Sequence, residues 1–89
     1  MLQYHAAFYM PKKPGDMVVV EVLDFPGVLS QGFDLADARV MIASALEDMA
    51  EDYLESGRPL PRTNEGADAS EADLIELISL RAAAGSTRR

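Results

Sequence analysis

The sequence predicts an α+β domain in which a small antiparallel sheet of three to four strands packs against one long helix. Three short segments with strand character come first, in residues 2–10, 17–23 and 28–33. The apolar residues then change from a two-residue period to steps of three and four in residues 35–56, which is typical of an amphipathic helix. An Ile- and Leu-rich run at 74–80 follows. The expected order is therefore β-β-β-α-β.

The first two strands are expected to form a hairpin. In residues 2–10 the side chains of Tyr4 and Phe8 fall on one face of an alternating pattern, as in a strand with one buried side. The pair Pro14-Gly15 suits the central positions of a type II turn. Residues 18–23 are rich in valine, which fits a pleated, half-buried surface.

The segment Asp24-Phe25-Pro26-Gly27 predicts the end of the second strand and a corner. Pro26 cannot donate to a sheet ladder, and it restricts Phe25 to an extended conformation. Gly27 and Gly32 tolerate backbone conformations that other residues avoid. We expect the corner to place Phe25 in the core or against a neighbouring subunit. A direct contact between the exposed bend and a partner is the alternative.

The helix has recognisable signals at both ends. Asp34 is placed as the N-cap, and Asp37 follows three residues later, which makes a weak capping box. Gly57 stands just past the last apolar residue of the pattern, where glycine commonly ends a helix. Pro59 and Pro61 then favour an extended exit. These signals predict a helix of about six turns.

Taken in order, these motifs resemble the HicB-like antitoxin family, small bacterial proteins that neutralise a partner ribonuclease. The matching residues are Tyr4 and Phe8, Asp24 to Gly27, Ser30 to Gly32, Asp34, Asp37-Ala38, Gly57, Pro59 and Pro61, so the resemblance covers about residues 2–62. It implies a partial RNase H-like fold and an antitoxin of a type II toxin–antitoxin system, bound to a small basic HicA-type mRNA-cleaving toxin. The alternative is an orphan HicB-like oligomeric domain that binds and regulates another protein.

The last apolar run is open to two interpretations. Ser70 followed by Asp73 would suit a helix cap, whereas the Ile- and Leu-rich run at 74–80 would suit a strand. We favour the strand because the resemblance implies a fourth strand after the proline-rich exit. Residues 1–80 are then one HicB-like domain, and 81–89 are expected to form a disordered basic tail.

The charge of the chain points to a basic partner. The net charge is −7, and residues 1–80 carry five basic side chains against all fifteen acidic ones, a net −10. Such an acidic body repels nucleic acid, whose binding depends on Lys and Arg at phosphates. It could steer a basic protein toward its site. Solubility alone is the alternative explanation.

Five acidic residues gather on the second half of the expected helix. They are Glu47, Asp48, Glu51, Asp52 and Glu55. Like charges four residues apart repel slightly, and acids near a helix C-terminus oppose the helix dipole. A mildly unfavourable choice repeated this often favours a toxin-binding surface, with an ordinary solvated face as the alternative.

The residue types leave little room for catalysis, and we expect no enzyme activity, catalytic residue, metal or cofactor. The absence of cysteine excludes disulfides, thiolate zinc sites and cysteine nucleophiles. The single histidine, His5, is expected at a surface or an interface. A carboxylate metal cluster would need Glu21, Asp24 and Asp34 to converge. Glu21 and Asp24 lie three apart on a strand, hence on opposite faces.

Three expectations concern partners and location. The N-terminus lacks the pattern of a signal peptide and no apolar run approaches a membrane span, which predicts a cytoplasmic protein. A domain this small often self-associates, so we expect a homodimer or higher homo-oligomer. Many HicB-like antitoxins also carry a C-terminal DNA-binding domain. About 28 residues follow Pro61 here, too few for such a module, so direct DNA binding is not expected.

Overall fold

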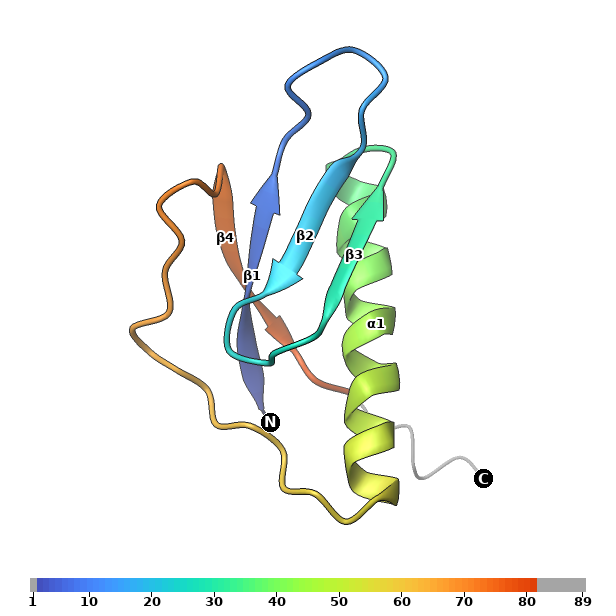
Figure 1. The fold of residues 1–89 in the computed structure, drawn as a ribbon, viewed down its shortest axis with the longest axis vertical. Helices are drawn as coiled ribbons and strands as arrows, with labels where there is room; N and C mark the ends of the chain where they lie inside the picture. The colour runs from blue at the N-terminus through green and yellow to red at the C-terminus, as the bar shows by residue number, and fades with distance from the viewer. Residues whose placement is uncertain (1, 82–89) are drawn as a thin grey trace.

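The computed structural model describes residues 2–81 and confirms the expected α+β order (Figure 1). Its elements are β1 (Gln3–Tyr9), β2 (Val18–Val22), β3 (Leu29–Gly32), α1 (Leu35–Glu55) and β4 (Leu74–Ser79). The expected tail, residues 81–89, lies outside the described residues apart from Arg81. Within the described part, no helix is both long and apolar enough to cross a membrane.

The four strands form one antiparallel sheet in the order β3-β2-β1-β4. The strand interpretation of residues 74–80 is therefore confirmed. The helix-cap signal does not act as a cap, because the Asp73 carboxylate instead accepts a 2.7 Å hydrogen bond from the Met10 N–H beyond the end of β1. Pairing with β1 thus decides the structure of a segment whose local signals are ambiguous.

The helix covers one face of the sheet, where it packs against β2 and β3 (Figure 1). The largest fully buried side chains of this core are Tyr4, Phe8, Phe25, Ile42, Leu46, Val18, Val20 and Val28. The predicted alternation holds for the middle of β1, since Tyr4, Ala6 and Phe8 are all buried. Burial of these apolar side chains supplies the main stabilisation of the domain.

The other face of the sheet is only partly covered. Val19 and Leu29 on this face are 43% and 63% exposed, whereas Ala7 at its centre is fully buried. In the register of the sheet Ala7 lies between Glu21 of β2 and Ile75 of β4. Larger residues on both neighbouring strands therefore flank this small residue. We call this side the open face.

The two ends of α1 are closed as the sequence predicts. The Asp34 carboxylate accepts a 2.8 Å hydrogen bond from the Asp37 N–H, and the Asp37 carboxylate accepts one of 2.9 Å from the Phe33 N–H. At the other end Gly57 has a φ of 76°, and the Arg58 N–H donates to the Tyr53 carbonyl at 2.8 Å. This is the Schellman arrangement that satisfies the last carbonyls of a helix.

Gly32 lets β3 approach the first turn of α1. A Cβ atom added at Gly32 would collide with the backbone of Ala38. The collision involves backbone rather than a flexible side-chain end, so relief would require the helix to move away from the sheet. Ala38 itself is fully buried. The two residues at this contact, Gly32 and Ala38, are therefore both small, which permits the close approach.

We expect Gly32→Ala to lower the free energy of unfolding by about 1–3 kcal/mol, because the added methyl group forces α1 away from β3. Urea denaturation measures the change. Gly66→Ala is the matched control, since its added Cβ would make only an ordinary 3.6 Å contact with Asn64. A Gly32 variant as stable as the Gly66 variant would contradict the close packing.

Candidate functional site

The Asp24 carboxylate joins three separate segments of the chain. Its Oδ1 accepts a 2.8 Å hydrogen bond from the His5 N–H in β1. Its Oδ2 accepts from His5 Nδ1 at 2.8 Å and from the Asn64 N–H at 3.0 Å. The corner after β2, the first strand and the connection from α1 to β4 therefore meet at one carboxylate. The Asp24 side chain is only 1% exposed.

Two opposing effects act on the pKa of Asp24. Burial acts to raise this pKa, because it disfavours the charged form. The hydrogen bonds from His5 and Asn64 favour the charged form and outweigh burial, so the pKa lies below its ordinary value. Asp24 is therefore an ionised, fully satisfied structural anchor at neutral pH. With Asp24 ionised, the ring proton of His5 must lie on Nδ1.

His5 is less exposed than the surface position that the sequence led us to expect, and its place at an interface stays a prediction. Its side chain is only 14% exposed, and its ring faces Asp24. The two residues lie nineteen positions apart, so their pairing depends on how β1 and the corner meet in the sheet. No local spacing signals this contact. The alternation of β1 places His5 on the open face, as predicted.

Phe25 links the corner to the core. It is fully buried, as the corner interpretation of the sequence predicts. Its ring lies 5.3 Å from that of Tyr4 and 5.0 Å from that of Tyr53, the second contact being edge-to-face. Tyr4 in turn donates a 2.6 Å hydrogen bond to the Pro61 carbonyl. The corner, the helix and the helix exit are thereby held together.

The three carboxylates considered for a metal cluster have separate partners. Glu21 accepts a 2.5 Å hydrogen bond from the Tyr9 hydroxyl, Asp24 holds His5 and Asn64, and Asp34 caps α1. Among residues 2–81 no group of three or more metal-ligating side chains gathers at one point. These residues therefore serve the fold in the arrangement seen here.

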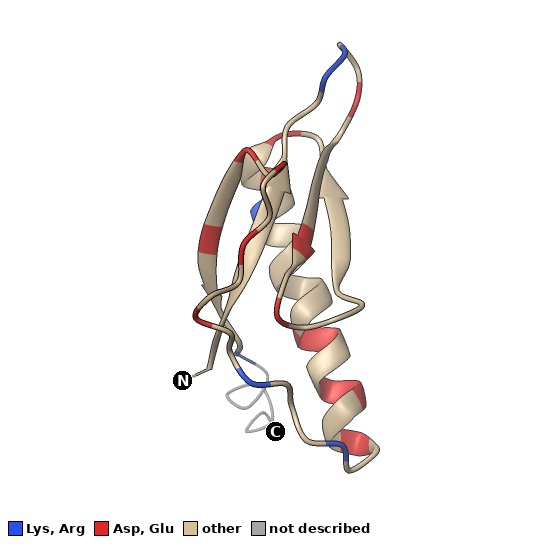
Figure 2. Ribbon diagram, turned by 60° about the vertical axis from the view of Figure 1, so that its left-hand side comes forward, with Lys and Arg blue, Asp and Glu red and all other residues tan. Residues whose placement is uncertain are grey.

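The five acidic residues of the helix follow one another along its second half, where Figure 2 shows several acidic positions, and together they form the acidic helix surface. These are Glu47, Asp48, Glu51, Asp52 and Glu55; Glu47 is half-buried and the other four are exposed. The last turn of α1 contains no basic residue. The two ion pairs among the described residues, His5–Asp24 and Arg39–Glu76, involve none of the five. The charges of these five acidic residues are thus available to a partner.

The basic residue nearest in sequence to this surface is engaged elsewhere. The Arg58 guanidinium lies 3.9 Å from the centre of the Tyr53 ring, and its Nε donates to Ser56 at 2.9 Å. This cation–π contact holds the guanidinium on the Tyr53 ring, and neither ion pair among the described residues joins Arg58 to the acidic helix surface.

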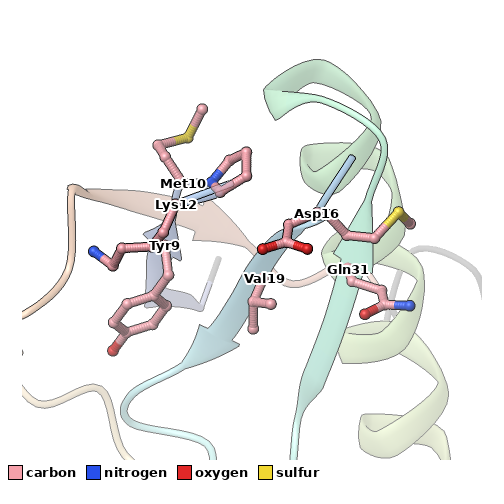
Figure 3. A pocket seen from close by; sticks show the side chains of 8 residues that line it. Tyr9, Met10, Lys12, Asp16, Val19 and Gln31 are labelled. Atoms are coloured by element: carbon pink, nitrogen blue, oxygen red, sulfur yellow. The ribbon is translucent and has the colours of Figure 1, made fainter. Parts of the chain in front are cut away.

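A hollow of about 350 Å³ lies on the open face beside the β1–β2 hairpin (Figure 3). It is lined by Tyr9, Met10, Pro11, Lys12, Asp16, Met17, Val19 and Gln31. The hydrogen bond to Glu21 raises the pKa of Tyr9 to about 12, with burial adding to the effect. The phenol therefore stays protonated at neutral pH and is a poor general base. No local sequence pattern signals this hollow, because its lining comes from three strands and a turn.

We expect Asp24→Asn to lower the free energy of unfolding by about 1–3 kcal/mol, because the amide nitrogen cannot accept and leaves a buried N–H group unpaired. The effect should depend on pH. A lowered folded-state pKa gives stability that is complete above the ordinary value of 3.8 and is lost as pH falls through the folded value. Urea denaturation at about pH 7 and about pH 2.5 should therefore show a smaller difference between wild type and variant in acid.

Asp16→Asn is the control for this change, because Asp16 is an exposed acid in the β1–β2 turn. Its effect should stay within about 0.5 kcal/mol at both pH values. An Asp24 variant that matches the Asp16 variant in stability would show that the carboxylate is not an anchor.

The comparisons with known proteins agree with this geometry. No protein-family model matches the sequence, and no curated protein matches it significantly. The crystal structure of the N-terminal domain of the Burkholderia pseudomallei antitoxin HicB is similar, with a TM-score of 0.70 and 26% sequence identity. That match covers 88% of this chain and 96% of the other.

The crystal structure of the Burkholderia pseudomallei antitoxin HicB gives a TM-score of 0.71 and 27% identity. The match covers 89% of this chain and 63% of that longer one, so the chain spans less than two thirds of its length. The similarity in fold, with one four-stranded antiparallel sheet and one helix, therefore extends over nearly the whole chain. The chain has a HicB-like fold, as the sequence motifs imply.

Proposed function

We propose that this protein is a HicB-like antitoxin, which binds and neutralises a small basic RNA-cleaving toxin of the HicA type. The observation that carries the proposal is the structural similarity to the N-terminal domain of an antitoxin over 88% of this chain. The identity of 26% lies in a range where fold and general role are often shared while particular partners differ. The toxin is therefore the part of the proposal that most needs an experiment.

We further propose the acidic helix surface as the contact for the toxin. Its carboxylates have no part in the core, and residues 1–80 carry a net charge of −10. A ribonuclease that binds RNA phosphates needs a basic surface, and an acidic helix is complementary to it. Covering that surface would block access of RNA to the toxin, so inhibition would require no catalysis by the antitoxin.

The first test is co-expression with a candidate toxin, a small basic protein of the HicA type. We expect the two proteins to co-purify as a stable complex, and we expect the antitoxin to restore growth that the toxin alone arrests. Loss of cellular mRNA in the arrested culture should be prevented as well. Absence of both a complex and rescue would contradict the antitoxin role. It would favour the orphan HicB-like domain with another protein partner.

The second test is charge reversal on α1. The double substitution Glu51→Lys and Asp52→Lys should slow association with the toxin about tenfold and weaken its dependence on salt, because steering acts mainly on the association rate. Both side chains are exposed, so the fold should be retained. Stopped-flow or surface-plasmon measurements at two ionic strengths give the rates.

The matched control is Glu65→Lys with Asp68→Lys, two exposed acids in the connection between α1 and β4. Both double variants change the net charge by the same amount, so only position distinguishes them. Equal slowing by the two would mean that overall charge, and not the helix surface, steers the toxin. Unchanged association in the helix variant would reject the surface but not the antitoxin role.

A further inference from the structure

One edge of the sheet offers unpaired main-chain groups along a whole strand. The Leu80 N–H donates to the Leu2 carbonyl at 2.8 Å, which sets the phase of the ladder between β4 and β1. In an antiparallel ladder the residues that bond to a given neighbour alternate. The N–H and C=O groups of Ile75, Leu77 and Ser79 therefore point away from β1. We call these groups the free edge of β4.

No described residue pairs with the free edge of β4. This strand has one neighbour, β1, and the backbone hydrogen bonds formed by turns and connections in residues 2–81 do not involve Ile75, Leu77 or Ser79. In Figure 1 and Figure 2 α1 lies toward the opposite edge of the sheet, over β2 and β3. The helix thus does not cover the free edge of β4.

The free edge carries few of the features that normally prevent strand pairing. Exposed edges are usually protected by proline, by charged side chains (lysine above all), by a bulge or by a charge that points inward. β4 has neither proline nor lysine, and it pairs with β1 in unbroken register. Its one charged residue, Glu76, is held by Arg39 of α1 through hydrogen bonds of 3.0 and 2.6 Å on the helix side. This edge is therefore suited to pairing.

The side chains beside this edge are apolar on the open face. Leu77 is 54% exposed, and Ile75 is half-buried next to it. A soluble domain gains by covering such an exposed strand, because both the unpaired amides and the apolar side chains lose contact with water. The opposite edge, β3, differs: it has only four residues, and α1 packs against it.

We propose that the free edge of β4 binds a second copy of this chain, as an antiparallel β4–β4 pair centred on Leu77. In this register Leu77 lies opposite Leu77 of the second copy, and Ile75 lies opposite Ser79. Every outward N–H and C=O of the free edge then finds a partner. The two sheets become one continuous sheet related by a two-fold axis, and the same surface serves both copies.

The charge of Glu76 selects this register over its neighbour. A pairing centred on Glu76 would place the two Glu76 side chains directly opposite each other, which is unfavourable for like charges. It would also leave part of the free edge unpaired. Centring on Leu77 places Glu76 opposite Ile78 and keeps its ion pair with Arg39. The self-complementarity of the strand is the reason to assign a second copy rather than a foreign strand.

This inference is independent of the toxin, because the acidic helix surface and the free edge of β4 lie on different elements. The purified protein alone should sediment as a dimer whose population rises with concentration. Leu77→Lys should raise the dimer dissociation constant at least about tenfold, since the substitution acts twice and sets two ammonium groups at the axis. Leu29→Lys, at an exposed leucine of β3, is the matched control and should leave the dimer unchanged.

Single cysteines test the register directly, because the chain has no other cysteine. In Leu77→Cys the two Cα atoms would lie about 5.5 Å apart, within the range of about 4.4–6.8 Å that a disulfide needs. The variant should therefore form a covalent dimer on mild oxidation. In Ser79→Cys the two copies of the substituted residue would be about 13 Å apart, and this variant should stay monomeric on a non-reducing gel.

Three results would overturn the proposal. A protein that stays monomeric at all concentrations would leave the free edge to another partner. A dimer that survives Leu77→Lys would have its interface elsewhere. Cross-linking through Ser79→Cys, or through Leu29→Cys, in preference to Leu77→Cys would show a different register or a different edge. Circular dichroism of each variant ensures that a loss of dimer is not a loss of fold.

Discussion

The rest of the structure depends on the hydrogen bonds that surround the Asp24 carboxylate. β1, the corner after β2 and the connection out of α1 all meet at this carboxylate. Because the carboxylate is buried and ionised, each of its partners must be present for its burial to be tolerated. The connection beginning at Pro61 is thereby held against the end of β1. The chain can then return along the sheet as β4.

This arrangement separates the surfaces that hold the fold from those left free to bind. The inner side of α1 carries the core, with small residues such as Ala38 facing Gly32 where the helix approaches the sheet most closely. The outer side of α1 does not pack in the core. It therefore tolerates five acidic residues, although acidic side chains near a helix C-terminus are unfavourable. The free edge of β4 lies at the edge of the sheet opposite β3, and α1 packs against β3 and β2. A toxin and a second copy could therefore bind without competing for one element.

Much of the fold could be predicted from the sequence, because its signals are local. Pro26 ends a strand wherever the rest of the chain lies, Asp34 caps a helix through its own neighbours, and Gly57 adopts a conformation that most residues avoid. The order of these signals was also enough to indicate the family resemblance. Only the last strand needed the resemblance to decide between two local interpretations.

The candidate site could be predicted less well, because its contacts join distant positions. His5 and Asp24 are nineteen residues apart, and Arg39 and Glu76 are thirty-seven apart. Such pairs depend on strand register and on how the helix crosses the sheet, and neither is written in the spacing of any one segment. The same holds for the burial of Ala7. Its small size on a nominally exposed face made sense only once the neighbouring strands were in place.

The most direct test of the antitoxin account is inhibition of RNA cleavage in a purified system. The proposed HicA-type toxin would be incubated with a labelled RNA while this protein is titrated in. The account predicts that cleavage falls linearly and stops at a fixed stoichiometric ratio, because a covered toxin surface cannot bind RNA. Undiminished cleavage at a large excess of this protein would contradict it.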